Sequence, residues 1–266
     1  MRDNDSLDVL ECSNCGLVFL SSFDHIVEDF YENSGMHNGK FAIDIDTWIR
    51  ETIYDDERRV KLYSEMIKDK DILDFGCGTG GFLQRVKQTA KNAYGVELEK
   101  RLQKHFMRNE LTVYSDLESF NKQVDYIFLF HSLEHIKNPF ALLEKLKQKL
   151  NPAGKVIIEV PNADDALLTL YKSKAFSCFT YWSPHLYLYN QRTLYILAKK
   201  AGLNIEAIKQ VQRYPLSNHL YWLAKGVPGG HLSWAFLNNP ELEQAYSSTL
   251  ASLGKCDTIV GYFSLI

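Results

Sequence analysis

Continuous apolar stretches alternate with amphipathic stretches through the middle of the chain. The apolar runs cover residues 72–74, 93–96, 111–114, 124–130 and 156–160, and segments with apolar residues three or four positions apart lie between them. Continuous runs are typical of parallel strands buried on both faces, and the spaced pattern is typical of the helices that cover such strands. The alternation therefore predicts an α/β protein with a Rossmann-like doubly wound sheet.

Two further strands are expected at 203–208 and 258–263, which brings the sheet to seven strands. We expect the last strand to lie antiparallel beside the sixth and the others to be mostly parallel. Helices are expected at 82–92 and 191–201. Another begins at Asn138-Pro139, where asparagine caps the first turn and proline fits the first helical position, and we expect it to run through Leu150 to Gly154. A long helix over 47–68 should face the core with Ile53, Val60, Tyr63 and Ile67.

The stretch Asp74-Phe75-Gly76-Cys77-Gly78-Thr79-Gly80-Gly81 reads as strand, tight loop and helix start. Glycines are needed in such a loop where a ligand lies against the backbone. The spacing of Gly76, Gly78 and Gly81 fits a dinucleotide loop, whereas Asp74 followed by Gly76, Gly78 and Gly80 fits a second type of loop. A carboxylate at the strand end would repel a pyrophosphate but suits a ligand that carries an ammonium group.

Glu97 follows the next strand, 17 residues beyond Gly80. This offset is close to the ~20 residues at which a carboxylate binds the ribose hydroxyls of a nucleotide ligand. A carboxylate at this point could instead favour the start of the following helix through the helix dipole. The distance from the glycine loop favours the ribose role.

Composition limits the partners and the compartment. The 266 residues are 45% hydrophobic with a formal charge of −3, so we expect a globular protein without general attraction to nucleic acid. No apolar run approaches the ~18 residues of a membrane span, and the N-terminus lacks the apolar core of a signal peptide. Five scattered cysteines make a disulfide framework unexpected. The simplest compartment is the cytoplasm, and the oligomeric state is left open.

Cys12-Ser13-Asn14-Cys15-Gly16 supplies two cysteines at the spacing of a zinc knuckle. Tetrahedral zinc needs four ligands, and no second pair of cysteines or histidines follows nearby. We therefore expect no bound metal and interpret the segment as a turn that leads into an apolar strand at 17–20.

The middle of the chain resembles the class I S-adenosylmethionine-dependent methyltransferases. The resemblance rests on the glycine loop behind Asp74, on His131-Ser-Leu-Glu-His-Ile-Lys-Asn-Pro, and on Asn151-Pro-Ala-Gly-Lys with a strand that closes in Pro161-Asn162. It runs from about residue 70 to 163. It implies S-adenosylmethionine as cosubstrate and, by position, that Asp116 binds the adenine amino group, with an exposed loop aspartate as the alternative interpretation of Asp116. The cosubstrate-binding residues implied are Asp74, Phe75, Gly76, Gly78, Gly80, Glu97, Leu98, Asp116, Leu117 and His131.

The pattern changes after residue 163. Segment 164–190 is rich in aromatic residues, and in the family the connection after the fifth strand often forms part of the acceptor pocket. Residues 214–254 then insert turns and helices. We accordingly divide the chain into an N-terminal arm over 1–40, which resembles the remnant of a zinc-binding module, and a methyltransferase domain over 41–266.

The expected reaction is methyl transfer to a small polar acceptor. His185 and His131 are the candidates for a base at an acceptor hydroxyl, and His135 is expected to be structural. Related sugar C-methyltransferases show Tyr-x-Glu-His where this chain has Trp182 and Pro184 before His185, which favours O-methylation of a sugar, a polysaccharide precursor or a secondary-metabolite precursor. Two alternatives are an NAD-dependent oxidoreductase and a non-catalytic protein that binds S-adenosylmethionine.

Overall fold

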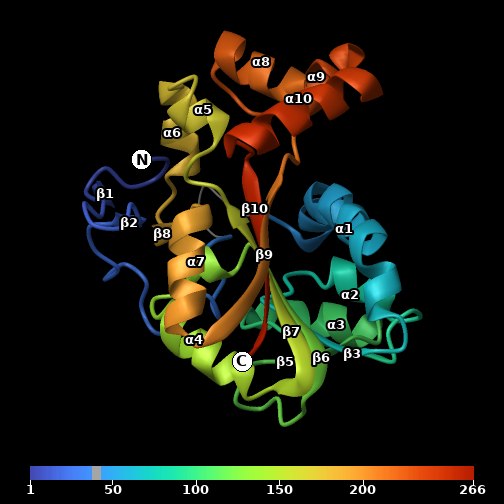
Figure 1. Ribbon diagram of the computed structural model, residues 1–266. Coiled ribbons are helices and arrows are strands. Elements are labelled where there is room, and N and C mark those ends of the chain that lie inside the picture. Colours follow the sequence, from blue (N-terminus) through green and yellow to red (C-terminus); the bar gives the residue numbers. More distant parts are fainter. Residues whose placement is uncertain (38–42) are drawn as a thin grey trace.

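The computed structural model describes residues 1–37 and 43–266, which form a central sheet with helices on both faces (Figure 1). The sheet has the strand order β5-β4-β3-β6-β7-β10-β9. Neighbouring strands pair in parallel, except that β10 is antiparallel to both β7 and β9. The predicted doubly wound sheet with an antiparallel last strand is confirmed. The strands are β3 (Asp71–Phe75), β4 (Asn92–Val96), β5 (Thr112–Tyr114), β6 (Val124–Phe130), β7 (Leu150–Pro161), β9 (Leu203–Val211) and β10 (Thr258–Leu265).

Alternate side chains of β6 divide the core between the two faces. Ile127 and Leu129 pack in the cluster that contains residues of α4 (Pro139–Lys147) and α7 (Gln191–Lys200). Phe128 and Phe130 pack with residues of α1 (Ile45–Ile67) and α2 (Gly81–Val86) on the opposite face. A strand buried on both faces needs the continuous apolar sequence seen here, which explains why β6 was predicted with its observed ends.

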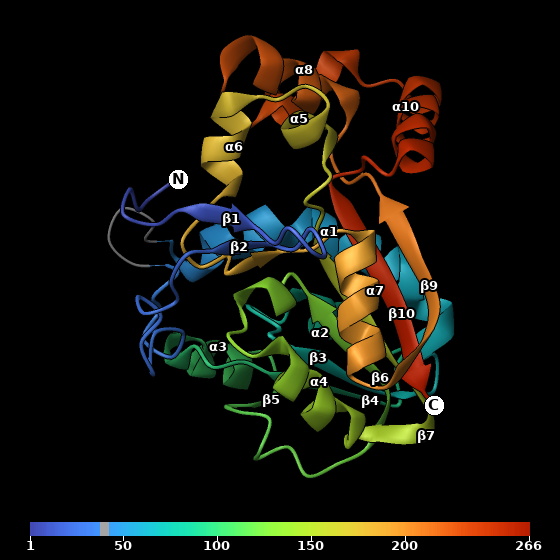
Figure 2. The ribbon, with the colours of Figure 1, turned by 60° about the vertical axis from the view of Figure 1, so that its left-hand side comes forward.

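Five helices form a layer beyond the carboxyl ends of the parallel strands (Figures 1 and 2). They are α5 (Ala166–Thr169), α6 (Lys174–Thr180), α8 (Leu216–Lys225), α9 (Gly230–Ser233) and α10 (Pro240–Leu253). The described residues also include α3 (Gln103–Arg108) and the short turns η2 (Lys100–Leu102), η3 (Leu133–His135) and η4 (Ala235–Leu237). The layer stands over the edge of the sheet at which ligands of doubly wound folds bind.

Three predicted details of the helices are wrong. The helix that begins after Asn138 ends at Lys147, and both Leu150 and Gly154 lie in β7 because Leu150 pairs with Val124 of β6. The helix after the glycine loop ends at Val86 and continues only as turns. Ile53 on α1 is 40% exposed, because that part of α1 turns charged residues rather than apolar ones towards the sheet.

The first residues form a small sheet with the segment after α6. β1 (Val9–Glu11) pairs with β2 (Val18–Leu20), and β2 pairs with β8 (Tyr187–Leu188), all antiparallel. Cys12 and Cys15 lie in the turn between β1 and β2, and all five cysteines are free. The expected boundary between residues 40 and 41 lies outside the described residues. Among the helices described, none combines the length and the apolar composition needed to cross a lipid bilayer.

Candidate functional site

The glycine loop leaves β3 and turns back sharply into α2. Gly76 and Gly78 have φ values of +72° and +53°, a region that side chains with a Cβ rarely adopt. A Cβ on Gly76 would lie 2.4 Å from the Ser132 Oγ, so the loop also passes too close to the end of β6 for any other residue. These glycines therefore allow the loop to pack closely against the end of β4, where the Gly76 N–H donates to the Val96 carbonyl at 2.8 Å.

Glu97 holds this loop from the end of β4. Its Oε2 accepts a hydrogen bond from the Gly78 N–H at 2.9 Å, and its Oε1 accepts one from the Glu99 N–H at 2.9 Å. Burial raises the pKa of Glu97, although both backbone donors oppose this shift. Each carboxylate oxygen has a second lone pair, so Glu97 can still accept hydrogen bonds from a ligand.

A cavity of about 150 Å³ lies between the glycine loop and Glu97. It collects six of the ten residues predicted to bind the cosubstrate, from the ends of three neighbouring strands. These are Phe75, Gly76, Gly78, Glu97, Leu98 and His131. Carboxyl ends of parallel strands meet at one edge of a sheet, which is why segments so spaced in the sequence converge here.

Asp74 faces a second and larger cavity on the other side of the loop. Its side chain is 3% exposed, and within the described chain its Oδ1 has no hydrogen-bond partner. Burial raises the pKa of Asp74 to about 8, even though Arg59 acts in the opposite direction. An unpaired buried carboxyl of this kind would be stabilised in its ionised form by a ligand cation.

Three other predicted residues line neither cavity. The carboxylate of Asp116 closes a turn by accepting hydrogen bonds from the Ser119 N–H at 2.6 Å and the Ser115 hydroxyl at 3.0 Å. Leu117 packs in the main core, and Gly80 caps α2 against Leu111. Their roles in cosubstrate binding stay predictions.

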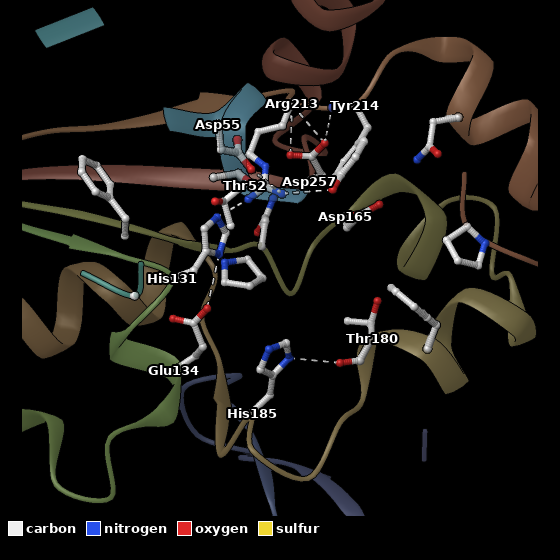
Figure 3. Close-up of a pocket in the computed structure, with 18 of the residues that line it drawn as sticks. Thr52, Asp55, His131, Glu134, Asp165, Thr180, His185, Arg213, Tyr214 and Asp257 are labelled. Carbon is white, nitrogen blue, oxygen red and sulfur yellow. Dashed lines mark hydrogen bonds and ion pairs between the residues drawn. The ribbon is translucent and has the colours of Figure 1, made fainter. Parts of the chain in front are cut away.

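The larger cavity has a volume of about 480 Å³ and reaches from the glycine loop to the helical layer (Figure 3). Its walls come from α1, from the end of β6, from the segment 164–190 and from residues 213–231. Of the aromatic residues expected there, Phe176, Phe179 and His185 line it, whereas Tyr187 and Tyr189 pack elsewhere. Trp222 from the later insertion also lines it, and the sequence offered no signal for that.

A buried ion cluster, which sequence reasoning missed, lies behind one wall of this cavity and contributes Arg59 to its lining. Glu159 of β7 is fully buried, and its Oε1 lies 2.7 Å from guanidinium nitrogens of both Arg58 and Arg59 on α1. These cations, together with His131, hold the pKa of Glu159 well below its usual range despite burial. The signal was present in the sequence as a lone acid inside the apolar run Val156-Ile-Ile-Glu-Val.

His131 is fixed between three charged groups. Its Nδ1 lies 3.3 Å from Glu134 Oε1, and its Nε2 lies 3.3 Å from Glu159 Oε1 and contacts the Arg213 guanidinium. The residue has a positive φ of 52°, and its N–H donates to the Glu159 carbonyl at 2.8 Å. His131 lines both cavities, so it lies where the predicted cosubstrate and acceptor regions meet.

His185 points into the larger cavity from the segment after α6 (Figure 3). Its Nδ1 donates to the Thr180 carbonyl at 3.2 Å, and its ring packs against those of His135 at 5.0 Å and Trp182 at 5.6 Å between centroids. Burial and the neighbouring His135 lower the pKa of His185 to about 4, so the ring is neutral at physiological pH. His135, expected to be structural only, lines both cavities as well.

Comparison with known proteins agrees with this architecture. A family model described as a methyltransferase domain matches residues 50–208. A solved S-adenosylmethionine-dependent methyltransferase from Archaeoglobus fulgidus superposes with a TM-score of 0.56 at 20% identity, covering 83% of this chain and 99% of that one. Magnesium protoporphyrin IX methyltransferase from Synechocystis, with bound S-adenosylhomocysteine (SAH), gives a TM-score of 0.53 at 13% identity over 91% and 99% of the two chains.

The curated relatives correct one expectation. A protein of Nautilia profundicola named tRNA U34 carboxymethyltransferase is 31% identical over 106 residues, which are 35% of each chain. Other matching relatives carry the same name, and this chain spans less than half of their length. The expectation of a small-molecule acceptor without any nucleic-acid partner is contradicted by these names. Net charge alone does not exclude a nucleic-acid partner, because a local surface rather than the whole chain meets a nucleic acid.

Proposed function

The chain belongs to the class I S-adenosylmethionine-dependent methyltransferases, and on that premise we propose that it methylates a hydroxyl oxygen of a polar, ring-sized acceptor. S-adenosylmethionine is the cosubstrate that the family and the fold share. The acceptor would be a ring of the size of a sugar or a nucleoside. It would lie in the larger cavity, and the methyl group would reach it past the glycine loop.

The observation that carries this proposal is the continuity of the larger cavity. Gly76 and Gly78 line it at one end, and His185 and Trp222 line it at the other. Its volume of about 480 Å³ is within the usual ~300–1,000 Å³ of small-ligand pockets. Methyl transfer requires the sulfonium and the acceptor oxygen to lie in line with water excluded, and a cavity that joins both regions allows this.

Methyl transfer requires little of the protein beyond the correct positioning of the sulfonium and the acceptor oxygen. The carbon–sulfur bond of the sulfonium breaks with its electron pair going to sulfur, a carbon–oxygen bond forms, and the hydroxyl proton leaves. His185 and His131 both line the cavity and are the candidates to receive that proton. Neither the transfer of the proton to one of these rings nor its loss to water alters the requirement for an in-line arrangement.

A labelled-methyl assay tests the proposal. Purified protein would be incubated with S-adenosylmethionine carrying a labelled methyl group and a panel of hydroxyl-bearing acceptors, with calorimetry of the cosubstrate alone beside it. We expect the protein to bind the cosubstrate and to transfer the label to an acceptor oxygen. The labelled product should be a methyl ether that is stable to base. Label found only on nitrogen or carbon would contradict the O-methylation.

A second candidate acceptor is a uridine of tRNA, which the names of the curated relatives favour. Those names belong to proteins of which this chain covers 35–45%, so the activity cannot be carried over whole. The same assay with unfractionated tRNA, before and after ribonuclease treatment, separates the two candidates. Label that enters intact tRNA and is recovered in nucleosides after digestion identifies RNA as the acceptor. If no label enters tRNA, the result favours an acceptor that is not part of a nucleic acid.

A further inference from the structure

Three side chains of metal-ligating types meet on the wall of the larger cavity. Glu134 and His135 come from η3, after β6, and His185 comes from the segment after α6, 50 residues later. One donor atom of each lies within 4.8 Å of the other two. Ligand atoms around tetrahedral zinc lie roughly 3.3–3.5 Å apart, given bonds of about 2.0–2.1 Å. Small side-chain rotations would therefore bring the three into bonding range.

Both histidine rings are already oriented as metal ligands are. The Nδ1 of His135 is 2.8 Å from the Pro184 carbonyl, and the Nδ1 of His185 is 3.2 Å from the Thr180 carbonyl. A carbonyl oxygen only accepts, so in each neutral ring the proton is on Nδ1 and Nε2 keeps a free lone pair. Ligating histidines usually have their second nitrogen fixed by such a backbone or carboxylate acceptor.

Glu134 supplies the independent observation that a ligand belongs here. The residue is 1% exposed, and neither of its carboxylate oxygens has a hydrogen-bond partner among the described residues. The His131 ring is close by, with its Nδ1 3.3 Å from Glu134 Oε1, but this pair lacks hydrogen-bond geometry. A buried carboxylate left in this state is costly unless it is paired or coordinates a metal.

We propose that Glu134, His135 and His185 bind one divalent transition-metal ion, with zinc as the best fit, and leave its remaining coordination position open to the cavity. Two imidazoles and one carboxylate with an open position are the donor set of catalytic rather than structural zinc sites. All three residues line the larger cavity, so the open position faces the space that the acceptor would occupy.

This site departs from the expectation that the chain holds no metal, which was based on the cysteine pair alone. Metal binding by itself does not depend on the proposed function, because it requires neither cosubstrate nor acceptor. If the proposed function holds as well, the metal would bind the acceptor oxygen and make its hydroxyl more acidic. The Nε2 of His185 would then be occupied by metal, and the hydroxyl proton would pass to His131 or to water.

Cobalt titration of the metal-free protein tests the site directly. The full chain would be stripped with a chelator, dialysed, and titrated with Co²⁺ while the visible absorption of the bound ion is recorded. Zn²⁺ would then be added to displace it. We expect one equivalent of Co²⁺ with absorption bands of four- or five-coordinate geometry, and complete displacement by one equivalent of Zn²⁺.

Three variants and one matched control assign the ligands. Glu134→Gln, His135→Ala and His185→Ala should each lower the affinity for Co²⁺ at least 10-fold and change the absorption spectrum. The double variant Cys12→Ser, Cys15→Ser removes the competing sulfur ligands. It should leave the affinity for Co²⁺ and the absorption spectrum unchanged. Circular dichroism and the melting temperature of each metal-free variant check that it is folded. If an alanine variant does not fold, Glu134→Gln still tests the site, because it keeps the shape of the side chain.

The proposal is overturned if the parent protein binds no Co²⁺ or Zn²⁺ at micromolar concentration. It is also overturned if binding survives in both Glu134→Gln and His185→Ala, or is lost with the two cysteines. Calorimetry with S-adenosylmethionine on the same metal-free samples keeps the two proposals separate. If the protein binds the cosubstrate but no metal, only the proposed metal site is overturned. If it binds metal but no cosubstrate, only the proposed function is overturned.

Discussion

The two ends of the site are built in different ways. At the end where we propose that the cosubstrate binds (the cosubstrate end), the glycine loop and Glu97 belong to one strand–loop–helix–strand unit, and the backbone of Gly78 donates directly to the Glu97 carboxylate at 2.9 Å. At the end where we propose that the acceptor binds (the acceptor end), each wall comes from a different part of the chain, and ion pairs such as Arg59–Glu159 join residues 100 positions apart. The first end is local in sequence, and the second exists only in the folded protein.

This difference predicts how the two ends respond to substitution. Changes at the local end should affect the affinity for one ligand, because the unit holds its shape through backbone hydrogen bonds. Changes at the acceptor end should affect turnover or stability, because buried charges there depend on one another. Four substitutions test this contrast, beginning with the one for which we expect the largest effect.

His185→Ala should reduce turnover by ~10²–10⁴-fold while the Kd for S-adenosylmethionine changes less than about twofold. The reason is that His185 lines the acceptor cavity but not the cavity beside Glu97. Steady-state kinetics and calorimetry on the same sample measure both quantities. His25→Ala is the matched control, since His25 also bonds a backbone carbonyl, that of Ser183 at 2.7 Å, and lines neither cavity. Equal losses of turnover in His185→Ala and His25→Ala would show that both histidines act only through packing.

The sequence predicted the local end well and the distant end poorly. The alternation of strands and helices, and the meeting of the glycine loop with Glu97, follow from periodicity and from spacing within one unit. The meeting of Glu134 with His185, and of Glu159 with Arg58 and Arg59, depends on how α1 and the segment after β7 fold over the sheet. No pattern within a window of 20 residues carries that information. His135 illustrates this, because its position one turn after His131 suggested a structural role.

Arg59→Ala should destabilise the protein by ~3–5 kcal/mol, since the fully buried Glu159 would lose one of its two cations. Arg59 also lies over the Phe130 ring, 4.3 Å from its centroid, so the variant loses packing as well. Urea unfolding measures the free energy of unfolding. Arg58→Ala is the comparison, with a smaller expected loss because Arg58 is more exposed than Arg59. An Arg59→Ala variant as stable as the parent would mean that this cluster does not hold the acceptor end together.

Glu97→Ala should weaken S-adenosylmethionine binding by ~1–3 kcal/mol, or about 5–150-fold in Kd, with kcat at saturating cosubstrate nearly unchanged. Asp116→Ala should weaken it less, because Asp116 lies in an exposed turn outside both cavities. Calorimetry gives both values. A larger loss in Asp116→Ala than in Glu97→Ala would reverse our view of which carboxylate binds the cosubstrate, and two unchanged affinities would remove both.

Asp165→Asn should stabilise the protein at alkaline pH and leave it nearly unchanged at acid pH. Asp165 is 3% exposed, and its Oδ1 accepts a hydrogen bond from the Leu167 N–H at 2.6 Å, which an asparagine oxygen can still accept. Burial, and then the neighbouring Asp257, raise the pKa of Asp165 to about 8. The folded chain therefore retains a proton that the unfolded chain has lost, between about pH 4 and pH 8.

The sign of this linkage follows from the retained proton. The stability that the protonated Asp165 contributes is complete below the unfolded pKa and is lost as the pH rises through the folded pKa. Asparagine has no proton to lose, so the melting temperature of the variant minus that of the parent should grow from pH 5 to pH 8 and then level off. We expect a final difference of ~1–2 kcal/mol, or about 2–8 °C. Scanning calorimetry across pH 5–9 gives the curve, with Asp164→Asn next to it as a control at a partly exposed position. A difference that stays constant over this range would show that Asp165 is ionised in the folded protein and that burial at this position does not raise its pKa.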